Sequence, residues 1–427
     1  MSQSSRPTRR TFLARAAAAA AAGVAAPYLI PSGILAADGS PGPNERIGVA
    51  GIGVGRQGSG VYGGAAGSKL CRPVAVADAN IKRAEQLAAR YKIDAYRDYR
   101  KLLERKDVDA VTTATPDHWR ALVCIHACQA GKDVYAEKPL TLAIAEGTVL
   151  VQVVRKHRRV FQVGSQQRSM AMNRMACEFV RKGGLGKIAL VRGMNYPGPQ
   201  RSAALPEKPP PAGLDWDAWL GQAAMRPYHP DWHQGWMRWR DFSGGEMTNW
   251  GAHGLDQIQW ALGMDGGGPK ELWPLADGPK GAIGYRYPNG IEVHLDLERG
   301  PMGGAIFAGE KGKIEINRNK FTTNPPELIA DLPPKEEIDK WRDEVALWQA
   351  KYHLENWLDC MRTRQRPVAD VEIGHRSISI SHLANIAREL GRKLQWDPAR
   401  EQFVGDDEAN QFVARPRREG YELPQAT

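Results

Sequence analysis

The chain has 427 residues, of which 25% are charged and 42% hydrophobic, with 45 glycines and 29 prolines. This composition is typical of a globular protein long enough for two hydrophobic cores, and it excludes a disordered or fibrous chain. The net charge is +10, and the four arginines before Asp38 account for four of these charges. The rest of the surplus is scattered and includes no Lys/Arg block that would follow a phosphate backbone, so nucleic acid is not the expected partner. The five cysteines form no C-x-x-C pair and no zinc spacing, which disfavours a disulfide framework.

Residues 1–37 have the pattern of a twin-arginine export signal. Arg9 and Arg10 precede an uncharged, alanine-rich run from Ala16 to Ala37, which polar residues follow. A membrane anchor is the alternative, but alanine is weakly apolar, and prolines and glycines interrupt the run. We therefore expect a cleaved signal, a periplasmic or other extracytoplasmic location, and no membrane span in the mature chain.

Short apolar runs alternate with helical stretches from Arg46 to about residue 165. The apolar runs are predicted strands: Arg46–Ile52, Pro73–Asp78, Ala110–Thr115, Asp133–Ala136 and Val160–Val163. The stretches between them have apolar residues at helical spacing and are predicted helices: Ile81–Tyr91, His118–Ala130 and Leu142–Lys156. This alternation predicts an α/β Rossmann domain over residues 44–165, with a doubly wound parallel sheet covered by helices on both faces.

The first predicted strand runs into a glycine-rich turn, Gly53-Val54-Gly55-Arg56-Gln57-Gly58. Glycine lets the backbone approach a pyrophosphate closely, and the N–H groups at the start of the following helix donate to it. Asp78 ends the second strand, where a carboxylate accepts hydrogen bonds from the ribose hydroxyls of adenosine. This carboxylate favours NAD over NADP because it repels a 2′-phosphate, although Arg83 keeps NADP as an alternative.

Five motifs, in order, resemble the Gfo/Idh/MocA family of glucose–fructose oxidoreductase and inositol dehydrogenase. They are Gly53–Gly58, Ala114-Thr115-Pro116-Asp117, Glu137-Lys138-Pro139, Gly164-Ser165-Gln166-Gln167-Arg168 and Gly251-Ala252-His253-Gly254-Leu255-Asp256. The resemblance covers roughly residues 44–400 and extends to exported members that planctomycete-type bacteria encode. It implies a two-domain oxidoreductase whose further cofactor contacts are Thr115, Pro116, His118, Glu137, Lys138 and Gln166.

Beyond residue 165 the alternation of strands and helices stops. The predicted elements are a helix at Met172–Lys182, a strand at Lys187–Asn195, hairpins at Pro288-Asn289-Gly290 and Gly309-Glu310-Lys311-Gly312, and helices at Trp341–Arg364 and Ile373–Gly391. They predict an α+β domain over residues 166–400 with an open, mostly antiparallel sheet, followed by a tail, residues 401–427, that wraps the surface. The resemblance implies that the exposed face of this sheet forms a homodimer or homotetramer.

Lys138 and His253 are the predicted catalytic pair, together with Asn249. Lys138 follows a strand at the carboxyl edge of the first sheet, where its ammonium would stabilise a developing alkoxide. The family motif makes His253 the proton acceptor during oxidation, with Asp256 close enough to orient it. The family usually has Asp at position 249, whereas Asn249 can bind substrate but cannot titrate. The predicted substrate contacts are Arg168, Tyr196, His233, Trp236, Asn249, His253 and Asp256.

Eight of the 13 tryptophans lie between Trp216 and Trp273, interleaved with charged residues and histidines. Flat aromatic faces beside hydrogen-bonding groups suit a sugar ring, whose C–H face stacks while its hydroxyls bind polar side chains. No metal site is predicted, because prolines near His229 and His233 disfavour the helix that their spacing would need. Ordinary core packing is the alternative for the tryptophans predicted to contact carbohydrate, which are Trp232, Trp236 and Trp239.

Export bears on the reaction, because no pool of free NAD exists outside the cytoplasm. The cofactor is therefore expected to be held tightly and restored within each cycle. The favoured function is hydride transfer to or from a sugar, polyol or sugar derivative. A redox-neutral NAD-dependent glycosidase or lyase is the first alternative, and a non-catalytic, cofactor-retaining carbohydrate-binding protein is the second.

Overall fold

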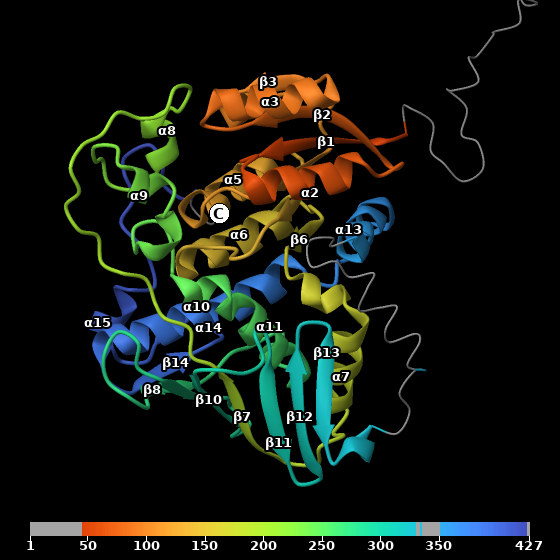
Figure 1. The fold of residues 1–427 in the computed structure, drawn as a ribbon, viewed down its shortest axis with the longest axis vertical. Helices are drawn as coiled ribbons and strands as arrows, with labels where there is room; N and C mark the ends of the chain where they lie inside the picture. The colour runs from red at the N-terminus through yellow and green to blue at the C-terminus, as the bar shows by residue number, and fades with distance from the viewer. Residues whose placement is uncertain (1–44, 330–333, 335–350, 425–427) are drawn as a thin grey trace, which may run out of the picture. The chain divides into compact units, whose positions relative to one another are not determined.

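A computed structural model describes residues 45–329, 334 and 351–424, so the predicted export signal lies outside the described residues (Figure 1). Strands and helices alternate in the first part of this structure, as predicted. They are β1 (Ile47–Ile52), α2 (Arg56–Ala66), β2 (Cys71–Ala77), α3 (Ile81–Tyr91), β3 (Asp94–Tyr96), α4 (Tyr99–Leu103), β4 (Ala110–Thr113), α5 (Asp117–Gln129), β5 (Asp133–Ala136), α6 (Ile144–Lys156) and β6 (Phe161–Val163).

Six parallel strands form the first sheet, in the order β3-β2-β1-β4-β5-β6. Neighbouring residues of β1 point to opposite faces, as in any strand. Val49 packs in a core with α2 and α3, whereas Ala50 packs in a core with α4, α5 and α6. Helices on both faces explain why these strands are almost continuously apolar, and the predicted doubly wound sheet is confirmed.

Two elements of the first domain, β3 and α4, were not expected from the sequence. β3 is only three residues long, and its burial pattern is exposed to intermediate, so it carries no apolar period. β3 is held in place by parallel pairing with β2. Such pairing joins two segments, so the residues of β3 alone do not reveal it. α4 follows directly, capped by the Asp98 side chain, which accepts a hydrogen bond from the backbone N–H of Arg100 at 2.9 Å.

The second part of the chain builds a larger sheet and the helices that cover it. Its elements are η1 (Gln166–Ser169), α7 (Ala171–Arg181), β7 (Ile188–Met194), α8 (Trp216–Leu220), α9 (Pro230–His233), η2 (Trp236–Arg238), α10 (Glu246–Asn249), α11 (Gly251–Ala261), β8 (Glu271–Pro274), β9 (Ile283–Arg286), β10 (Glu292–Leu297), β11 (Ala305–Gly309), β12 (Gly312–Asn317), β13 (Lys320–Asn324), η3 (Pro326–Leu328), α13 (Lys351–Thr363), α14 (Val371–Leu390), β14 (Leu394–Asp397), β15 (Gln402–Phe403) and α15 (Asp407–Asn410).

Nine strands form this second sheet, in the order β13-β12-β11-β7-β10-β9-β8-β14-β15. All neighbouring pairs are antiparallel except β7 and β10, which run parallel. Both predicted hairpins are present. The first, at Pro288-Asn289-Gly290, joins β9 to β10 with Gly290 at a φ of +88°, a backbone conformation that favours glycine. The prediction of a mostly antiparallel sheet is therefore confirmed.

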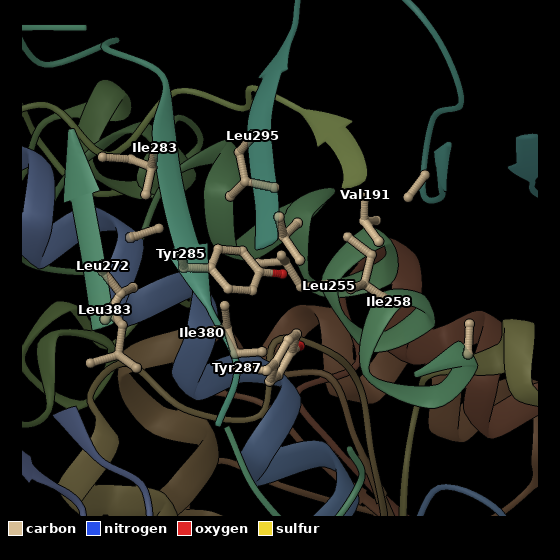
Figure 2. Close-up of a cluster of buried hydrophobic side chains, with 14 of the residues drawn as sticks. Val191, Leu255, Ile258, Leu272, Ile283, Tyr285, Tyr287, Leu295, Ile380 and Leu383 are labelled. Atoms are coloured by element: carbon tan, nitrogen blue, oxygen red, sulfur yellow. The ribbon is translucent and has the colours of Figure 1, made fainter. Parts of the chain in front are cut away.

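One face of the second sheet is buried against α7, α11 and α14. Figure 2 shows Tyr285 of β9 and the neighbouring Tyr287 between side chains of α11 and α14. Both tyrosines are fully buried, and the Tyr287 hydroxyl donates to Gln259 Oε1 at 2.6 Å, so its polar end has a partner. This packing fixes α11, the helix that carries His253.

α13 shows that the two halves of the chain are interleaved. Its predicted span began at Trp341, but residues 335–350 lie outside the described part of the chain. The described helix packs against the first sheet, where Trp357 is fully buried with its ring 5.8 Å from that of Tyr135. Among the described residues, no helix has both the length and the hydropathy needed to cross a bilayer.

Candidate functional site

A cavity of about 910 Å³ lies at the carboxyl ends of the parallel strands. This is the edge where open parallel sheets bind ligands. Its walls come from the turn after β1, from the ends of β2, β4 and β5, and from residues between Asp215 and His253. The predicted site residues that line it are Gly53, Gly55, Arg56, Gln57, Asp78, Thr115, Pro116, Glu137, Lys138, Gln166, His233, Trp236, Asn249 and His253.

The turn between β1 and α2 fits the pyrophosphate of a dinucleotide. Gly53 has a φ of +72°, which residues with a side chain rarely adopt. A Cβ added at Gly58 would lie 1.9 Å from the Gly53 carbonyl oxygen, so α2 approaches the turn as closely as only glycine allows. The backbone at Gly55 is open to a ligand, and α2 begins at Arg56 with its N-terminal N–H groups at the cavity.

Asp78 follows β2 and both braces this turn and faces the cavity. Its Oδ2 accepts from the backbone N–H of Val54 at 3.0 Å, and its Oδ1 accepts from that of Asn80 at 2.8 Å. Arg83 lies 3.5 Å from the same carboxylate. Burial raises the pKa of Asp78, while Arg83 and the two N–H groups act in the opposite direction. A carboxylate has lone pairs beyond these contacts, which suits it to ribose hydroxyls.

Glu137 connects three of the predicted motifs. The side chain is buried, and its Oε1 accepts from Gln57 Nε2 at 3.0 Å and from Gln166 Nε2 at 3.1 Å. Its Oε2 accepts from the backbone N–H of Lys138 at 3.2 Å. Glu137 therefore holds the glycine-rich turn, the end of β5 and the start of η1 in one arrangement around the cavity.

Lys138 and Asn249 meet across the cavity from the two halves of the chain. Lys138 Nζ donates to Asn249 Oδ1 at 2.7 Å, and the Asn249 amide nitrogen donates to Glu246 Oε2 at 3.0 Å. Burial lowers the pKa of Lys138, although Glu137 and Asp117 act against this. The ammonium thus has an uncharged partner and stands where a substrate oxygen could replace or join it.

His253, on α11, lines the same end of the cavity as Lys138. Burial and the charge of Lys138 lower the pKa of the imidazole well below its ordinary value, so His253 is neutral near pH 7. A neutral imidazole can accept a proton from a substrate hydroxyl, whereas imidazolium cannot. Lys138 and His253 therefore offer a cation and a base to one substrate position.

Arg168 and Asp256, which were predicted to contact substrate, are not among the residues that line the cavity. The Arg168 guanidinium donates to both oxygens of Asp256, at 2.9 and 3.0 Å, and to Asp265 at 2.7 Å. Asp256 also accepts from Ser377 Oγ at 2.7 Å, so it does not orient His253. Arg168, Asp256 and Ser377 are buried and bonded to one another in this way, which indicates a structural role in joining η1, α11 and α14.

Tyr196 and His118 are also placed away from the cavity lining. The Tyr196 hydroxyl accepts from the backbone N–H of Gly303 at 3.1 Å. His118 lies 2.9 Å from the Trp219 carbonyl oxygen through Nε2, and its ring packs against Trp219 and Phe242. Burial lowers the pKa of His118 to about 4, so this imidazole stays neutral in the core rather than contacting a cofactor.

The tryptophan-rich part of the chain from Trp216 to Trp273, called the aromatic segment here, contributes both to a small core and to the cavity wall. Trp232 and Trp239 are buried, and their ring centroids lie 4.7 Å apart. For these two residues the structure agrees with the alternative of core packing. Trp236 and His233 line the cavity, as does Trp219, which was not among the predicted contacts. The structure therefore presents flat rings to the cavity from α8 and η2, beside a histidine.

Several lining residues were missed because no local pattern marks them. Arg318 reaches the reacting end from the turn between β12 and β13, more than 60 residues along the chain from His253. Arg97 and Arg100 line the end near Asp78. Asp117 did have a sequence signal, since it stands in the Thr-Pro-Asp motif; burial raises its pKa to about 6, against the charge of Arg120.

A Rossmann domain whose nucleotide cradle faces an amine and an imidazole defines a nucleotide-dependent oxidoreductase. Comparison with family profiles agrees with this class. Residues 46–165 match the Gfo/Idh/MocA profile described as "Oxidoreductase family, NAD-binding Rossmann fold", and residues 195–423 match its "C-terminal alpha/beta domain". The chain therefore belongs to the Gfo/Idh/MocA oxidoreductase family.

Individual relatives are more distant. Levoglucosan dehydrogenase of Pseudarthrobacter phenanthrenivorans is 25% identical over 259 residues, 58% of this chain and 60% of the relative. Inositol 2-dehydrogenase of Salmonella typhimurium is 28% identical over 144 residues, 33% of this chain and 42% of the relative. The chain thus aligns with less than two thirds of the length of these relatives.

Solved structures share the fold. WlbA dehydrogenase from Bordetella pertussis, in complex with NADH and UDP-GlcNAcA, gives a TM-score of 0.62 at 18% identity, covering 83% of this chain and 99% of that one. Levoglucosan dehydrogenase in complex with NADH and levoglucosan gives 0.58 at 17% identity, covering 82% and 99%. At such identities the likeness extends to the fold alone.

Proposed function

We propose that this protein is an NAD(H)-dependent oxidoreductase that acts on a sugar, polyol or sugar derivative. One observation carries the proposal: a single cavity of about 910 Å³ has the dinucleotide cradle at one end and Lys138, Asn249 and His253 at the other. Bound NAD(H) would supply the hydride chemistry. The relatives named for levoglucosan and inositol support a polyhydroxylated substrate.

The protein's own part in the reaction is the handling of one proton. During oxidation the neutral imidazole of His253 takes the hydroxyl proton, and the Lys138 ammonium stabilises the negative charge that grows on the oxygen. In reduction the roles reverse, and the proton returns from His253 to the carbonyl oxygen. Asn249 keeps the ammonium in place through its 2.7 Å hydrogen bond.

The aromatic wall supports the choice of a sugar-like substrate. Trp219 and Trp236 line the cavity together with His233, whose pKa burial lowers to about 4. A ring with a C–H face can stack on the indoles while its hydroxyls bond to polar groups. We favour NAD over NADP, because Asp78 stands where a 2′-phosphate would be repelled and Arg83 is already paired with it at 3.5 Å.

We also propose that the cofactor is retained through the catalytic cycle. A strap, residues 213–215, is bonded to the first domain beside Asp78. Ile81 N–H donates to the Gly213 carbonyl at 3.0 Å, and Asp215 N–H donates to the Ala79 carbonyl at 3.0 Å. Export by the twin-arginine route, which Arg9 and Arg10 support, would make such retention necessary, since free NAD is not available outside the cytoplasm.

The test is to incubate the purified protein with a panel of free sugars, polyols and glycosides. The absorbance of the bound cofactor at about 340 nm and the products released are followed together. Persistent reduction supports the proposed oxidoreductase. Net glycoside cleavage without lasting reduction would replace it with the redox-neutral alternative, and no response to any compound would favour a binding protein.

Lys138→Ala and His253→Ala provide the matched variants for this panel. Each is expected to lower turnover by roughly 10²- to 10⁴-fold while the protein keeps its nucleotide, because both side chains act on the substrate oxygen. Nucleotide content, measured after denaturation, separates loss of chemistry from loss of cofactor. Near-normal turnover in either variant would contradict the role given to that residue.

A further inference from the structure

A second cavity, of about 300 Å³, lies apart from the first and is lined by arginines. Its walls come from six segments: the turn before α6, the loop after β7, the chain at Arg240, the loop between β8 and β9, the C-terminal half of α14 and the chain after α15. The arginines in its lining are Arg201, Arg240, Arg388 and Arg415, and the lining contains one carboxylate, that of Glu389.

Glu389 neutralises little of this charge. It accepts from Arg201, whose side chain is 81% exposed at the mouth, and from Arg240 at 3.2 Å. One carboxylate is thus shared by two guanidinium groups. Arg240 also packs over the Phe412 ring at 5.4 Å, which holds its planar group at the cavity wall.

Arg388 and Arg415 bond only to uncharged oxygens within the described part of the chain. Arg388 is buried and donates to the carbonyl oxygens of Gly281 and Tyr196, each at 2.9 Å, and to the side chain of Asn195. Arg415 donates from Nη1 to the Arg240 carbonyl at 3.2 Å. A guanidinium has five N–H donors, so Arg415 keeps most of its donors for another partner.

The acids nearest to Arg415 outside the cavity lining are committed elsewhere. Glu146 pairs with Arg417, and Asp241 pairs with Arg226. Burial and Arg240 together lower the pKa of Arg415 to about 10, despite Glu146 and Asp241. The cavity therefore concentrates positive charge in a partly dry place, where an anion with several acceptor oxygens would be bound most strongly.

We propose that this cavity is a second ligand site, which binds the oxyanion group of a small molecule between Arg240 and Arg415. The group is a phosphate, a sulfate or a carboxylate, since all three accept from paired guanidinium donors. The volume exceeds the roughly 30 Å³ that one water occupies in the liquid, so the site has room for the anion and part of the molecule that carries it. A bound anion would join the aromatic segment to the chain after α15.

The experiment uses the full chain saturated with NAD, so that the dinucleotide cradle is filled. Inorganic phosphate, sulfate and acetate are titrated separately by calorimetry and by thermal unfolding, with chloride at equal ionic strength as the baseline. We expect one saturable site per chain and a melting temperature that rises with the logarithm of anion concentration. The anion that binds most tightly identifies the group.

Arg415→Gln and Arg400→Gln are the matched variants. Both remove one positive charge, but Arg400 is exposed and pairs with Asp397 at 3.8 Å. Arg415→Gln is expected to weaken binding by roughly tenfold or more, and Arg400→Gln to leave it unchanged. Should Arg415→Gln fail to fold, Arg240→Gln tests the same site from another segment.

Two results would overturn the proposal. Equal responses of the wild type and both variants would mean nonspecific screening of the basic surface. Absence of saturable binding by all three anions would mean that the cavity takes no small anion. Neither result bears on the redox function, which the sugar panel tests separately.

Discussion

At the reacting end of the cavity, the amide of Asn249 serves two partners at once. Its Oδ1 accepts from Lys138 Nζ at 2.7 Å, and its Nδ2 donates to Glu246 Oε2 at 3.0 Å. A carboxylate could make only the first contact, because it has no N–H to donate. Asn249 therefore allows the ammonium and Glu246 to coexist without two carboxylates side by side.

Replacing this amide by a carboxylate tests its role. Asn249→Asp should lower the melting temperature through repulsion with Glu246, and Glu246→Gln in the same chain should restore it. In the double variant Lys138 gains an anionic partner, so its pKa rises by roughly one to three units. The basic limb of the kcat/KM profile should then move to higher pH, measured against Glu246→Gln alone. An unmoved limb would mean that Lys138 does not titrate in the reaction.

The candidate site could be predicted from sequence where a local motif sits at the end of a strand. Lys138 lies two residues after the end of β5, and sheet topology then brings it to the cavity. Arg168 and Asp256 also stand in motifs, but neither motif predicts that the two side chains pair with each other, at 2.9 Å. Arg318 has no motif, since only the closure of a distant hairpin carries it to the site.

Among the elements, α13 docks on the first domain through a histidine whose two ring nitrogens are both engaged. His353 Nε2 lies 2.8 Å from the Val163 carbonyl oxygen, and Nδ1 lies 2.7 Å from Ser169 Oγ. The carbonyl can only accept, so Nε2 carries the hydrogen and Nδ1 accepts from the hydroxyl. This neutral form is also favoured by burial, which lowers the pKa of His353 to about 4.

The lowered pKa makes α13 docking sensitive to acid. In the unfolded chain this histidine has a pKa of about 6.5. Between that value and the lower pKa of the folded state, the unfolded state therefore binds more protons. Stability is therefore lost as the pH falls through this window, by up to ~1.4 kcal/mol per pH unit from His353. His353→Gln can keep both hydrogen bonds but cannot titrate. Denaturant titrations from about pH 7 to about pH 5 should show the wild type losing stability relative to the variant; parallel curves would refute the assignment.

Helices and strands whose own apolar residues recur at a regular spacing were predictable from the sequence. Elements that form only through pairing with another segment were not. α3 begins and ends at the predicted residues, Ile81 and Tyr91, because its apolar positions recur at helical spacing. β3 has no such pattern and exists through pairing with β2. α13 was expected as a helix, but its pattern could not say that it covers the first sheet, since an apolar face fits either core.

In the described chain beyond residue 46, several segments that follow the first domain in sequence pack back against it. The strap at residues 213–215 bonds beside Asp78, α13 covers one face of the first sheet, and Tyr421 packs edge-on against Trp119 at 5.5 Å. The tail predicted at residues 401–427 therefore contacts the nucleotide-binding domain. Of these returns, the strap reaches the cavity through Asp215, at the end near Asp78 where adenosine would lie.

The strap predicts that Arg97 controls how long the cofactor stays bound. Arg97 Nη1 donates to the Gly213 carbonyl at 2.9 Å, whereas Arg100, which lines the same end of the cavity, bonds to Asp98 within its own turn. Arg97→Ala loosens the strap by removing this hydrogen bond while the two backbone hydrogen bonds remain, so nucleotide dissociation should accelerate by roughly tenfold, as expected for loss of a charge-assisted hydrogen bond. Stopped-flow displacement of bound NADH, followed by fluorescence, measures this rate. Arg100→Ala removes an equal charge and should have little effect; equal acceleration in both variants would show that general electrostatics, not the strap, holds the cofactor.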